Sequence, residues 1–347
     1  MMNEGKNTEN REAEIAISSR VRLARNIDCI PFPTRMEPGQ GEAIIDRVWD
    51  SISQGSEALS ENLVLMKIGK LDPIDRQILV EKHLISPELG ESKRESAVIL
   101  SRDEKISIMV NEEDHLRIQC IFPGMMLDEA WKLCNRLDLL LEEKIDFAFD
   151  KNLGYLTCCP TNVGTGIRAS VMLHLPALGM TGYIKGILEA CGKIGIAVRG
   201  IYGENSEASG NMFQISNQVT LGQTEEEIVA NVMNVAAQII EQEKVLRGEL
   251  YDQNPYRFED RLYRSLGLLS HARIMTAEES QKLLSDVRLG VDMGIIGGIN
   301  IEILNEIMLV TQPAYIQRLA GRTLSPDERD IRRAELIRSS LGAEERS

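Results

Sequence analysis

The sequence predicts an α+β domain followed by an all-helical domain. Alternation of apolar and polar residues, which is typical of strands, recurs between about residues 15 and 221 and does not return after residue 255. Beyond that point only helical periodicity remains. The segment 251–255 ends in Asn254-Pro255, and a proline disfavours helix in the residue before it. We therefore expect a frayed N-terminus over 1–14, an α+β domain over 15–254 and a helical domain over 255–347.

Within the first domain, the period of the apolar residues distinguishes strands from helices. The predicted strands are 15–22, 63–68, 97–100, 106–110, 116–122, 154–158, 194–198 and 212–221. Helices are predicted over 40–53, 73–84 and 126–143, and from about residues 169 and 181 onward. A long helix is expected after Thr224, because Thr224 and Glu227 have the spacing of a capping box.

The second domain shows helical periodicity over 258–273, 276–289, 300–310 and 325–341. In the last of these, Ser325 is expected to be the N-cap, with Pro326 in the first turn. Arg329 and Arg333 are four residues apart and should be neighbours on one face, while Glu328 is placed to pair with Arg332.

The composition is that of an acidic globular protein. Among 347 residues, Lys and Arg number 39 and Asp and Glu 53, which gives a net charge of −14. Such a surface disfavours binding to nucleic acid or anionic membranes. No apolar run reaches the ~20 residues of a membrane-spanning helix, and the start lacks an apolar signal core, so we expect a cytoplasmic protein.

Cysteine and histidine are too sparse for a disulfide framework or a zinc site. The six cysteines are residues 29, 120, 134, 158, 159 and 191. They contain no C-x-x-C pair and are expected to be free thiols. No metal ion held by protein side chains is predicted.

Two nucleotide-binding motifs are incomplete. Between Gly186 and Gly192-Lys193 there is one residue too many for a P-loop, and Ile194 stands where a Ser or Thr would bind magnesium. The segment 164–169 fits G-x-G-x-x-A, but the second strand with its acidic residue is missing from the pattern.

A set of arginines and carboxylates in short segments is the stronger signal. Arg20 and Arg22 are two apart, so both should project from one face of a strand; Arg168 is expected to begin a helix, and Arg199 to end a strand. The planar guanidinium fork suits a polyphosphate. The alternative is a group of solvated arginines in ordinary ion pairs.

The segment 111–119 places further polar residues together if it is extended. Glu113, His115, Arg117 and Gln119 would then share one face, with Leu116, Ile118 and Cys120 toward the core. Glu112 would point to the opposite face from Glu113.

Five segments together resemble the phosphagen (guanidino) kinase family, and they occur in that family's order. The resemblance extends over about residues 15–246 and is closest to its bacterial protein-arginine kinases. The segments are Ser18-Ser19-Arg20-Val21-Arg22, Asn111-Glu112-Glu113-Asp114-His115-Leu116-Arg117, Cys159-Pro160-Thr161-Asn162-Val163-Gly164-Thr165, Arg168-Ala169-Ser170-Val171 and Arg199-Gly200-Ile201-Tyr202-Gly203-Glu204. The resemblance implies a mostly antiparallel sheet flanked by helices, and transfer of the ATP γ-phosphoryl group to a guanidinium.

The resemblance also implies the roles of individual residues. Glu113 and Glu204 would orient the guanidinium, with Glu113 as general base and Cys159 close by, although Cys158 is an adjacent alternative. ATP would be bound with Mg²⁺ held mainly by its phosphates and water. The implied ATP-binding residues are Ser18, Ser19, Arg20, Val21, Arg22, His83, Arg117, Arg168, Ala169, Ser170, Val171, Met172, Arg199, Gly200, Ile201, Tyr202, Gly203 and Glu204.

The substrate implied is an arginine residue of a protein, because the helical domain that closes the guanidine pocket of small-molecule phosphagen kinases has no counterpart before residue 18. A kinase for free arginine or another small guanidino compound is the alternative, as is a non-catalytic regulatory protein. The presence of both carboxylates, Glu113 and Glu204, argues against a non-catalytic protein. So does the presence of all five arginines of the resembling segments, which are Arg20, Arg22, Arg117, Arg168 and Arg199.

For the helical domain, the motif Arg329-Asp330-Ile331-Arg332-Arg333-Ala334 implies an allosteric phosphoarginine pocket formed by Arg329, Asp330, Arg333 and Ala334. The resemblance further implies a homodimer and a role in stress response and proteolysis. Its implied partners are a zinc-binding activator protein (McsA-like), the heat-shock repressor CtsR and the ClpC unfoldase.

Overall fold

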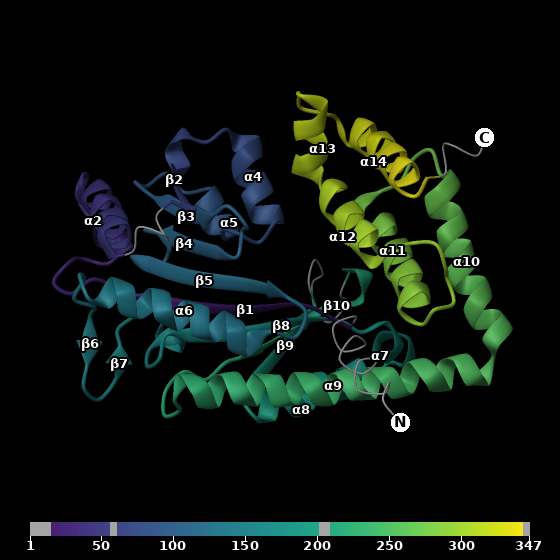
Figure 1. Cartoon of the computed structure of the whole chain (residues 1–347), viewed down its shortest axis with the longest axis horizontal. Helices are drawn as coiled ribbons and strands as arrows, with labels where there is room; N and C mark the ends of the chain where they lie inside the picture. Colours follow the sequence, from purple (N-terminus) through teal and green to yellow (C-terminus); the bar gives the residue numbers. More distant parts are fainter. Residues whose placement is uncertain (1–14, 56–60, 201–208, 343–347) are drawn as a thin grey trace.

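The computed structural model describes residues 15–55, 61–200 and 209–342, and an antiparallel sheet of eight strands lies at the centre of these residues (Figure 1). The strand order is β2-β3-β4-β5-β1-β8-β10-β9. The strands are β1 (Ala16–Arg25), β2 (Leu63–Lys67), β3 (Ala97–Ser101), β4 (Ile106–Val110), β5 (Leu116–Pro123), β8 (Ile167–His174), β9 (Ile196–Gly200) and β10 (Met212–Asn217). A two-stranded ribbon, β6 (Phe149–Asp150) and β7 (Gly154–Tyr155), stands apart from this sheet.

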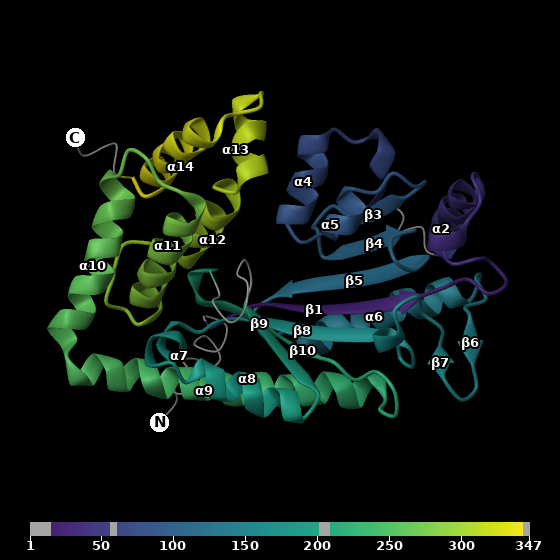
Figure 2. The same ribbon diagram turned by 180° about the vertical axis from the view of Figure 1, so that it is seen from behind.

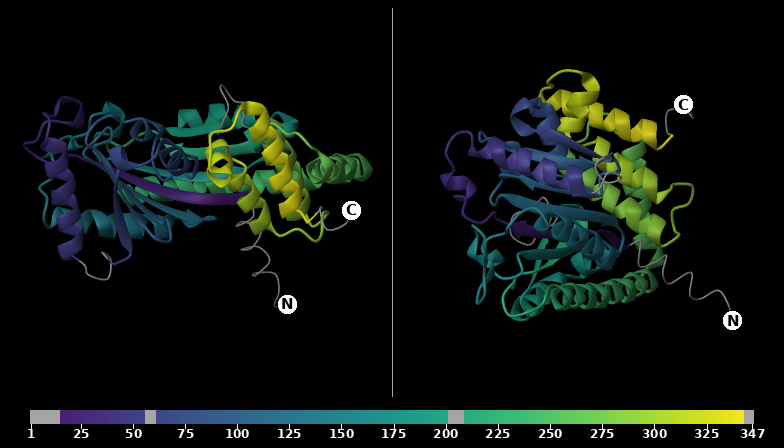
Figure 3. Two further views of the ribbon diagram at one scale, coloured as in Figure 1. Left: turned by 90° about the horizontal axis from the view of Figure 1, so that it is seen from above. Right: turned by 60° about the vertical axis from the view of Figure 1, so that its left-hand side comes forward.

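Helices flank the sheet and form the whole of the C-terminal part. In the first part they are α2 (Gln40–Gly55), α4 (Pro73–Glu81), α5 (Pro87–Gly90), α6 (Leu127–Glu142), α7 (Pro176–Thr181), α8 (Ile184–Lys193) and α9 (Glu225–Gln253). The C-terminal part contains α10 (Pro255–His271), α11 (Ala277–Asp292), α12 (Ile301–Val310), α13 (Pro313–Ala320) and α14 (Pro326–Ser340). Short 3₁₀ turns are η1 (Pro33–Arg35), η2 (Ile68–Lys70), η3 (Pro160–Asn162) and η4 (Ser209–Asn211). Figures 1 and 3 place α2 at one end of the long axis and α10–α14 at the other. The predicted fold class is confirmed.

The two faces of the sheet differ in what covers them. On one face, alternate residues of the central strands, such as Val21 and Leu23 of β1, are fully buried against α2, α6, α8 and α9. Figure 2 shows α8 and α9 along this side of the sheet. On the other face, α4 and α5 cover only the β3–β4 end, through a smaller apolar cluster that includes Leu84, Leu89 and Met109. The rest of this second face is left uncovered by the described helices, and the polar residues of β1, β5 and β8 project from it.

The C-terminal helices have their own apolar core and contact the first part through several elements. Leu262, Leu284 and Ile307 are among its buried residues. Helix α11 contacts η4 and α7, and α13 contacts α4. At the last contact both carboxylate oxygens of Glu81 accept from backbone N–H groups at the start of α13, those of Ala314 (2.8 Å) and Tyr315 (3.3 Å).

Helix α9 joins the two parts. It begins with the predicted capping box of Thr224 and Glu227. Glu243, fully buried in α9, accepts from the backbone N–H groups of Ala177 and Leu178 at the start of α7. One turn later Arg247 donates to Glu243 at 2.8 Å and to Asp292 of α11 at 3.3 Å. The helix is therefore bonded to the sheet domain and to the C-terminal helices at once.

Two predicted elements are wrong and three helices were not predicted. Residues near 169 form strand β8 instead of a helix, because pairing with β1 and β10 on both sides overrides the helix preference of Ala169. The expected strand at 154–158 shrinks to the two residues of β7. Helices α5, α7 and α13 carry too few residues to show a periodic apolar face. None of the described helices combines the length and apolar composition that a membrane crossing requires.

Candidate active site

Strand register gathers four arginines on the uncovered face of the sheet. Arg20 and Arg22 of β1 project from the same face, as expected from their spacing. Arg22 lies directly opposite Arg168 of β8, and Arg117 of β5 lies opposite Ala24 of β1. Since directly opposed residues of antiparallel strands point to the same side, the four guanidinium groups converge. We call Arg20, Arg22, Arg117 and Arg168 the arginine cradle.

The cradle is a cluster of like charges withdrawn from water. Burial first, and then the neighbouring cations Arg117 and Arg168, lower the pKa of Arg20 to about 10. Burial and the same kind of neighbours hold the pKa of Arg22 well below its ordinary value. The buried Nε of Arg22 has no hydrogen-bond partner among the described residues. An anion with several oxygens would satisfy that donor and neutralise the repulsion, so the cradle fits a polyphosphate.

Strand β9 adds Arg199 to the edge of the cradle. Arg199 lies opposite Gln214 of β10, whose Oε1 accepts from Arg20 at 2.8 Å. Burial first, and then Arg199 and Arg117, lower the pKa of Arg168. The exposed Arg199 therefore lies on the same face of the sheet as the buried arginines of the cradle.

His83 lies at another edge of the cradle, just beyond α4. Its backbone adopts a left-handed conformation (φ 58°), and its carbonyl accepts from Gln119 Nε2 at 3.0 Å. Burial, with Arg20 and Arg22 nearby, lowers the pKa of His83 to about 4, so its ring is neutral at pH 7. A neutral imidazole can accept a hydrogen bond beside a nucleotide without adding another positive charge.

The hairpin between β4 and β5 brings two carboxylates to Arg117. Nη1 of Arg117 donates to Glu112 Oε1 and Nη2 to Glu113 Oε2, both at 3.0 Å. Glu112 is buried and also accepts from Ser86 Oγ at 2.6 Å, whereas Glu113 is partly exposed. The prediction that Glu112 points away from this site is wrong. Asn111, at φ 60°, turns the chain there, so strand alternation does not apply to residues 111–115.

Burial raises the pKa of Glu113, and the nearby carboxylates of Asp114, Glu112 and Glu88 add to the effect, while Arg117 opposes it. A carboxylate whose proton affinity is raised is the better proton acceptor once ionised.

His115 does not share the face of Glu113, contrary to the prediction. Its ring is fully buried, where Nδ1 accepts from the Ile27 N–H and Nε2 lies 3.0 Å from the Pro31 carbonyl. Arg117 and Gln119 do share a face, with Leu116 and Ile118 buried on the other, because regular pairing begins only at β5.

A polar cleft of about 600 Å³ opens beside this hairpin. Its walls include Glu112, Glu113 and Arg117, together with Glu88 and Glu91 from the region of α5. Lys93 and Arg94 line it too, but the four carboxylates outnumber the three cations, which suits a cationic group, and Arg117 forms the boundary with the cradle.

The loop carrying the two adjacent cysteines is held against the same hairpin. Asp114 accepts from the Cys158 N–H at 2.7 Å and from Asn26 Nδ2 at 2.6 Å. Burial, with Asp114 and Glu113 close, raises the pKa of the Cys158 thiol to about 11, which keeps it protonated at neutral pH. Cys159 Sγ lies 3.0 Å from Thr161 Oγ1, and Cys159 is one of the neighbours that partly offset the lowering of the Arg168 pKa by burial and by the other arginines. Of the two thiols, Cys159 is therefore the one beside the cradle.

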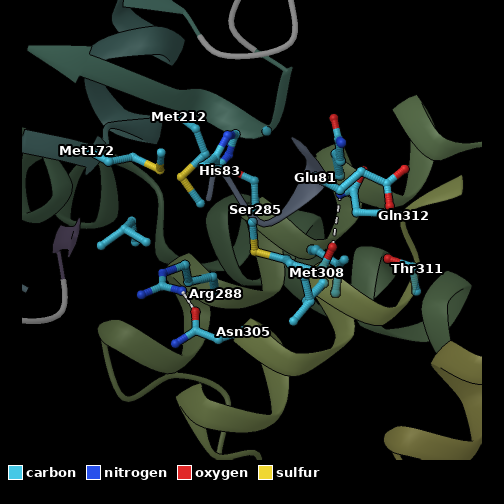
Figure 4. Close-up of a pocket in the computed structure, with 15 residues that line it drawn as sticks. Glu81, His83, Met172, Met212, Ser285, Arg288, Asn305, Met308, Thr311 and Gln312 are labelled. Atoms are coloured by element: carbon cyan, nitrogen blue, oxygen red, sulfur yellow. Dashed lines mark hydrogen bonds between the residues drawn. The ribbon is translucent and has the colours of Figure 1, made fainter. Parts of the chain in front are cut away.

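A second cavity, of about 200 Å³, lies where the sheet meets the C-terminal helices (Figure 4). His83 and Met172 line it from the first part of the chain, and Arg288 and Met308 from α11 and α12.

Comparison with known proteins decides the family. Residues 43–246 match the family "ATP:guanido phosphotransferase, C-terminal catalytic domain", and residues 255–347 match "Protein-arginine kinase McsB C-terminal domain". A protein-arginine kinase of Bacillus subtilis is 52% identical over 96% of this chain and 92% of its own length. That of Pelotomaculum thermopropionicum is 54% identical over 94% of this chain and 92% of its own length. That of Caldanaerobacter subterraneus is 50% identical over 96% of this chain and 99% of its own length.

The chain belongs to the protein-arginine kinase family.

Solved structures of phosphagen kinases share the fold. A lombricine kinase matches with a TM-score of 0.61 and 22% identity over 68% of both chains. The duplicated taurocyamine kinase of Schistosoma mansoni, solved with transition state analog components, matches with a TM-score of 0.59 and 26% identity over 73% of this chain and 37% of its own. The resemblance that the five segments indicated is thus confirmed.

In this protein-arginine kinase fold, the predicted ATP-binding segments divide between the two faces of the sheet. Ser18, Ser170 and Met172 share the face of the cradle by register. The residues between them in β1 and β8 have side chains that are buried on the other face of the sheet; these are Ser19, Val21, Ala169 and Val171. Only the backbones of these four residues therefore adjoin the site. Gly200 ends β9, and Ile201, Tyr202, Gly203 and Glu204 lie outside the described residues.

Helix α14 carries the tail motif away from the cradle (Figure 1). The guanidinium of Arg333 is buried and donates to the Met275 and Thr311 carbonyls, both at 3.0 Å, and to Asp330. Arg329 Nη1 donates weakly to the Leu324 carbonyl at 3.5 Å, and Ala334 is buried. The motif therefore forms a connected group in which Arg333 is already hydrogen-bonded.

Ser325 caps α14 as predicted, but the pairing predicted for Glu328 is wrong. Glu328 closes a capping box with Ser325 and pairs with Arg322, and Arg332 pairs with Glu335 instead.

Three residues near the site were missed. Gln214 could have been found, because it alternates with buried residues in β10 and so faces the cradle. Arg94, whose Nη1 donates to the Glu112 carbonyl at 3.2 Å, lies outside any helix or strand. Glu88 lies in α5, whose four residues are too few to show a periodic signal.

Proposed function

We propose that this chain transfers the γ-phosphoryl group of ATP to the guanidinium of arginine residues in proteins. The supporting observation is the shared position of Arg117, which belongs to the arginine cradle and is bonded to both Glu112 and Glu113. Phosphate and guanidinium sites would thus meet at one side chain. Family membership supports the same reaction.

ATP would lie with its phosphates on the cradle. Arg20, Arg22 and Arg168 are buried enough to hold phosphate oxygens without competing water, and the unpartnered Nε of Arg22 supplies a donor. Mg²⁺, held by phosphate oxygens and water, would offset charge on the phosphates. Among the described residues, no cluster of His, Cys, Asp or Glu is arranged to hold a metal by itself.

Glu113 would orient the target guanidinium and remove its proton. As the terminal nitrogen bonds to the γ-phosphorus, the bond from that phosphorus to the β–γ bridging oxygen breaks, and ADP leaves with the electron pair. The proton lost by the guanidinium goes to the Glu113 carboxylate, whose raised pKa suits it to the task. We assign Glu204 as a second orienting carboxylate and Cys159 as a neighbour of the guanidinium.

The choice of a protein over free arginine rests on the relatives and on the open cleft of about 600 Å³ beside Glu113. The test is to incubate the protein with ATP·Mg²⁺ and either free arginine or an unfolded, arginine-containing protein. We expect acid-labile phosphate on the protein only. Transfer to free arginine alone would assign the chain to small-molecule phosphagen kinases, and transfer to neither would favour a non-catalytic regulatory role.

We further propose that residues 255–347 form a dimerising and regulatory domain, with phosphoarginine bound at Arg329, Asp330, Arg333 and Ala334. The arginines would bind the phosphate and Asp330 the guanidinium. Because Arg333 is already bonded to Asp330 and two carbonyls, binding would require these contacts to rearrange. The activator, repressor and unfoldase named above are proposed as partners on the same resemblance.

Isothermal titration of phosphoarginine tests this pocket. The Arg329→Ala/Asp330→Ala variant should lose binding, while Arg332→Ala, whose side chain is exposed and pairs with Glu335, should bind normally. Unchanged binding in the double variant would limit the motif to a structural role.

A further inference from the structure

The cavity of about 200 Å³ between the sheet and the C-terminal helices continues the site beyond the arginine cradle (Figure 4). Its sheet-side wall includes Met172 of β8, which lies directly opposite Gln214 in the ladder, and Met212, which is two residues from Gln214 on β10 and so shares its face. Gln214 is the residue that accepts from Arg20. His83, whose pKa is lowered by Arg20 and Arg22, lines the same cavity. A molecule bound to the cradle by its phosphates therefore has this cavity directly beside it.

The other wall comes entirely from the C-terminal part of the chain. Leu284 and Arg288 of α11, and Asn305 and Met308 of α12, line it. These helices lie within residues 255–347, outside the region that matches the ATP:guanido phosphotransferase family. Any contact they make with a nucleotide would thus be an addition to the catalytic domain.

The chemistry of the walls fits a flat heteroaromatic ring. Three methionines, Met172, Met212 and Met308, approach the cavity from β8, β10 and α12. Thioethers are polarisable and pack favourably on aromatic rings. Arg288, almost fully buried, donates through Nη1 to Asn305 Oδ1 at 2.6 Å. With its oxygen engaged in this way, the Asn305 amide has N–H donors to offer a ring nitrogen.

We propose that α11 and α12 form the second wall of the pocket for the base of ATP, with Met308 packing on the base and Asn305 selecting it by hydrogen bonding. This proposal rests on the proposed function, because it requires the triphosphate on the cradle. Its consequence is that the C-terminal helices set the affinity for ATP as well as any regulatory response.

The test compares ATP with inorganic tripolyphosphate, which has the phosphates but no base. Isothermal titration in the presence of Mg²⁺ measures the Kd of each ligand for the full chain and for Asn305→Ala/Met308→Ala. We expect the Kd for ATP to rise on the order of tenfold in the variant, with the Kd for tripolyphosphate unchanged. In the kinase assay the same variant should raise KM for ATP and leave kcat close to that of the parent.

Two further variants separate the base contact from general damage to α12. Met308→Leu conserves volume and should keep most of the ATP affinity. Glu306→Ala, an exposed neighbour outside the cavity, should bind both ligands normally. ATP affinity unchanged in the double variant, or lost together with tripolyphosphate affinity, overturns the inference. A parent protein that binds neither ligand would instead contradict the proposed function.

Discussion

Arg117 connects the two halves of the candidate site through its two terminal nitrogens. Nη1 is bonded to the buried Glu112 and Nη2 to the more exposed Glu113. Its charge also lowers the pKa of Arg20, Arg22 and Arg168. Glu112 is therefore suited to hold Arg117 in place, which leaves Glu113 as the carboxylate available to a substrate.

Replacing Glu113 by Gln should keep the fold and lower kcat by on the order of 10²–10⁴, because the amide cannot accept the guanidinium proton. Steady-state kinetics with saturating ATP and protein substrate measure this. Glu112→Gln is the matched comparison and should act mainly on stability, through its bonds to Arg117 and Ser86. A large loss of kcat in Glu112→Gln alone would transfer the role of base to that residue.

Arg168→Lys and Arg199→Lys should each reduce kcat/KM by more than about tenfold, because lysine keeps the charge but lacks the planar fork. Arg136→Lys, at an exposed position of α6 on the opposite side of the sheet, should have no effect. Equal activity for all three variants would mean that Arg168 and Arg199 contribute only general charge.

The raised pKa of Glu113 predicts the pH dependence of the reaction. Its carboxylate must be ionised to accept a proton, so kcat/KM should fall as pH drops through this raised pKa. Glu88→Gln removes one of the negative charges that raise it, and the acidic limb of the pH profile should then move to lower pH. Glu91→Gln, on the same cleft but outside that set of charges, is the control. A limb that stays in place in Glu88→Gln, or moves to higher pH, would contradict this assignment.

Side-chain direction was predictable where the backbone is a regular strand. The shared face of Arg20 and Arg22 follows from a two-residue period alone. The same reasoning failed for Glu112 and His115, because the left-handed Asn111 starts a tight turn that no residue pattern in this segment indicates. Long-range register, which brings Arg168 opposite Arg22, lay beyond any local pattern.

At the scale of the elements, a buried ion pair fixes β1 to α6. Arg25, at the end of β1, donates from Nε and Nη2 to Asp138 Oδ2 at 3.2 and 2.6 Å, and its guanidinium carbon lies 3.5 Å from the centre of the Tyr155 ring. Gly166 passes so close that an added Cβ would stand 2.7 Å from Arg25 Nη1. This position, at φ 66°, therefore requires glycine on two grounds.

Asp138→Ala should lower the free energy of unfolding by ~3–5 kcal/mol, because it leaves the Arg25 charge buried without its partner. Urea denaturation measures the loss. The exposed pair Glu129–Lys132 on the same helix is the control, and Glu129→Ala should leave the unfolding midpoint nearly unchanged. A similar small effect in both variants would mean that water enters the Arg25 site.

Helix and strand types were largely predictable from periodicity, and the exceptions have a common cause. Strand β8 contains Ala169 and Ser170, which carry little strand preference, and it is a strand because β1 and β10 flank it. Helix α13 begins where Glu81, more than two hundred positions earlier, accepts from its first N–H groups. The local sequence indicates neither which strands flank β8 nor which residue accepts from the first N–H groups of α13.

At the scale of the whole molecule, the order of strands and the meeting of the two parts decide where the site lies. The sequence predicted an α+β part and a helical part, and the fold class is as expected. It contained no sign that α11 and α12 would face β8 and β10 across a cavity beside the cradle. That arrangement depends on the direction in which α10 leaves α9, and hence on packing between segments distant in the chain.

Helix α9, with its 29 residues, has a consequence for how the protein unfolds. Ile228 and Ile240 belong to the core of the sheet domain, while Leu250 packs against the core of the C-terminal helices, and Arg247 is bonded to Asp292 of α11. If either part unfolds, α9 loses packing contacts on that side, and the other part loses the support of the same helix.

Spectroscopy can detect this cooperativity, because both tryptophans, Trp49 and Trp131, lie in α2 and α6. Their fluorescence follows the sheet domain alone, whereas far-ultraviolet circular dichroism follows every helix. The two signals should trace one coincident denaturation curve. Separate curves would show that the chain comes apart at residue 255, where one helix ends and the next begins, and that α9 is a tether between two independently folding bodies.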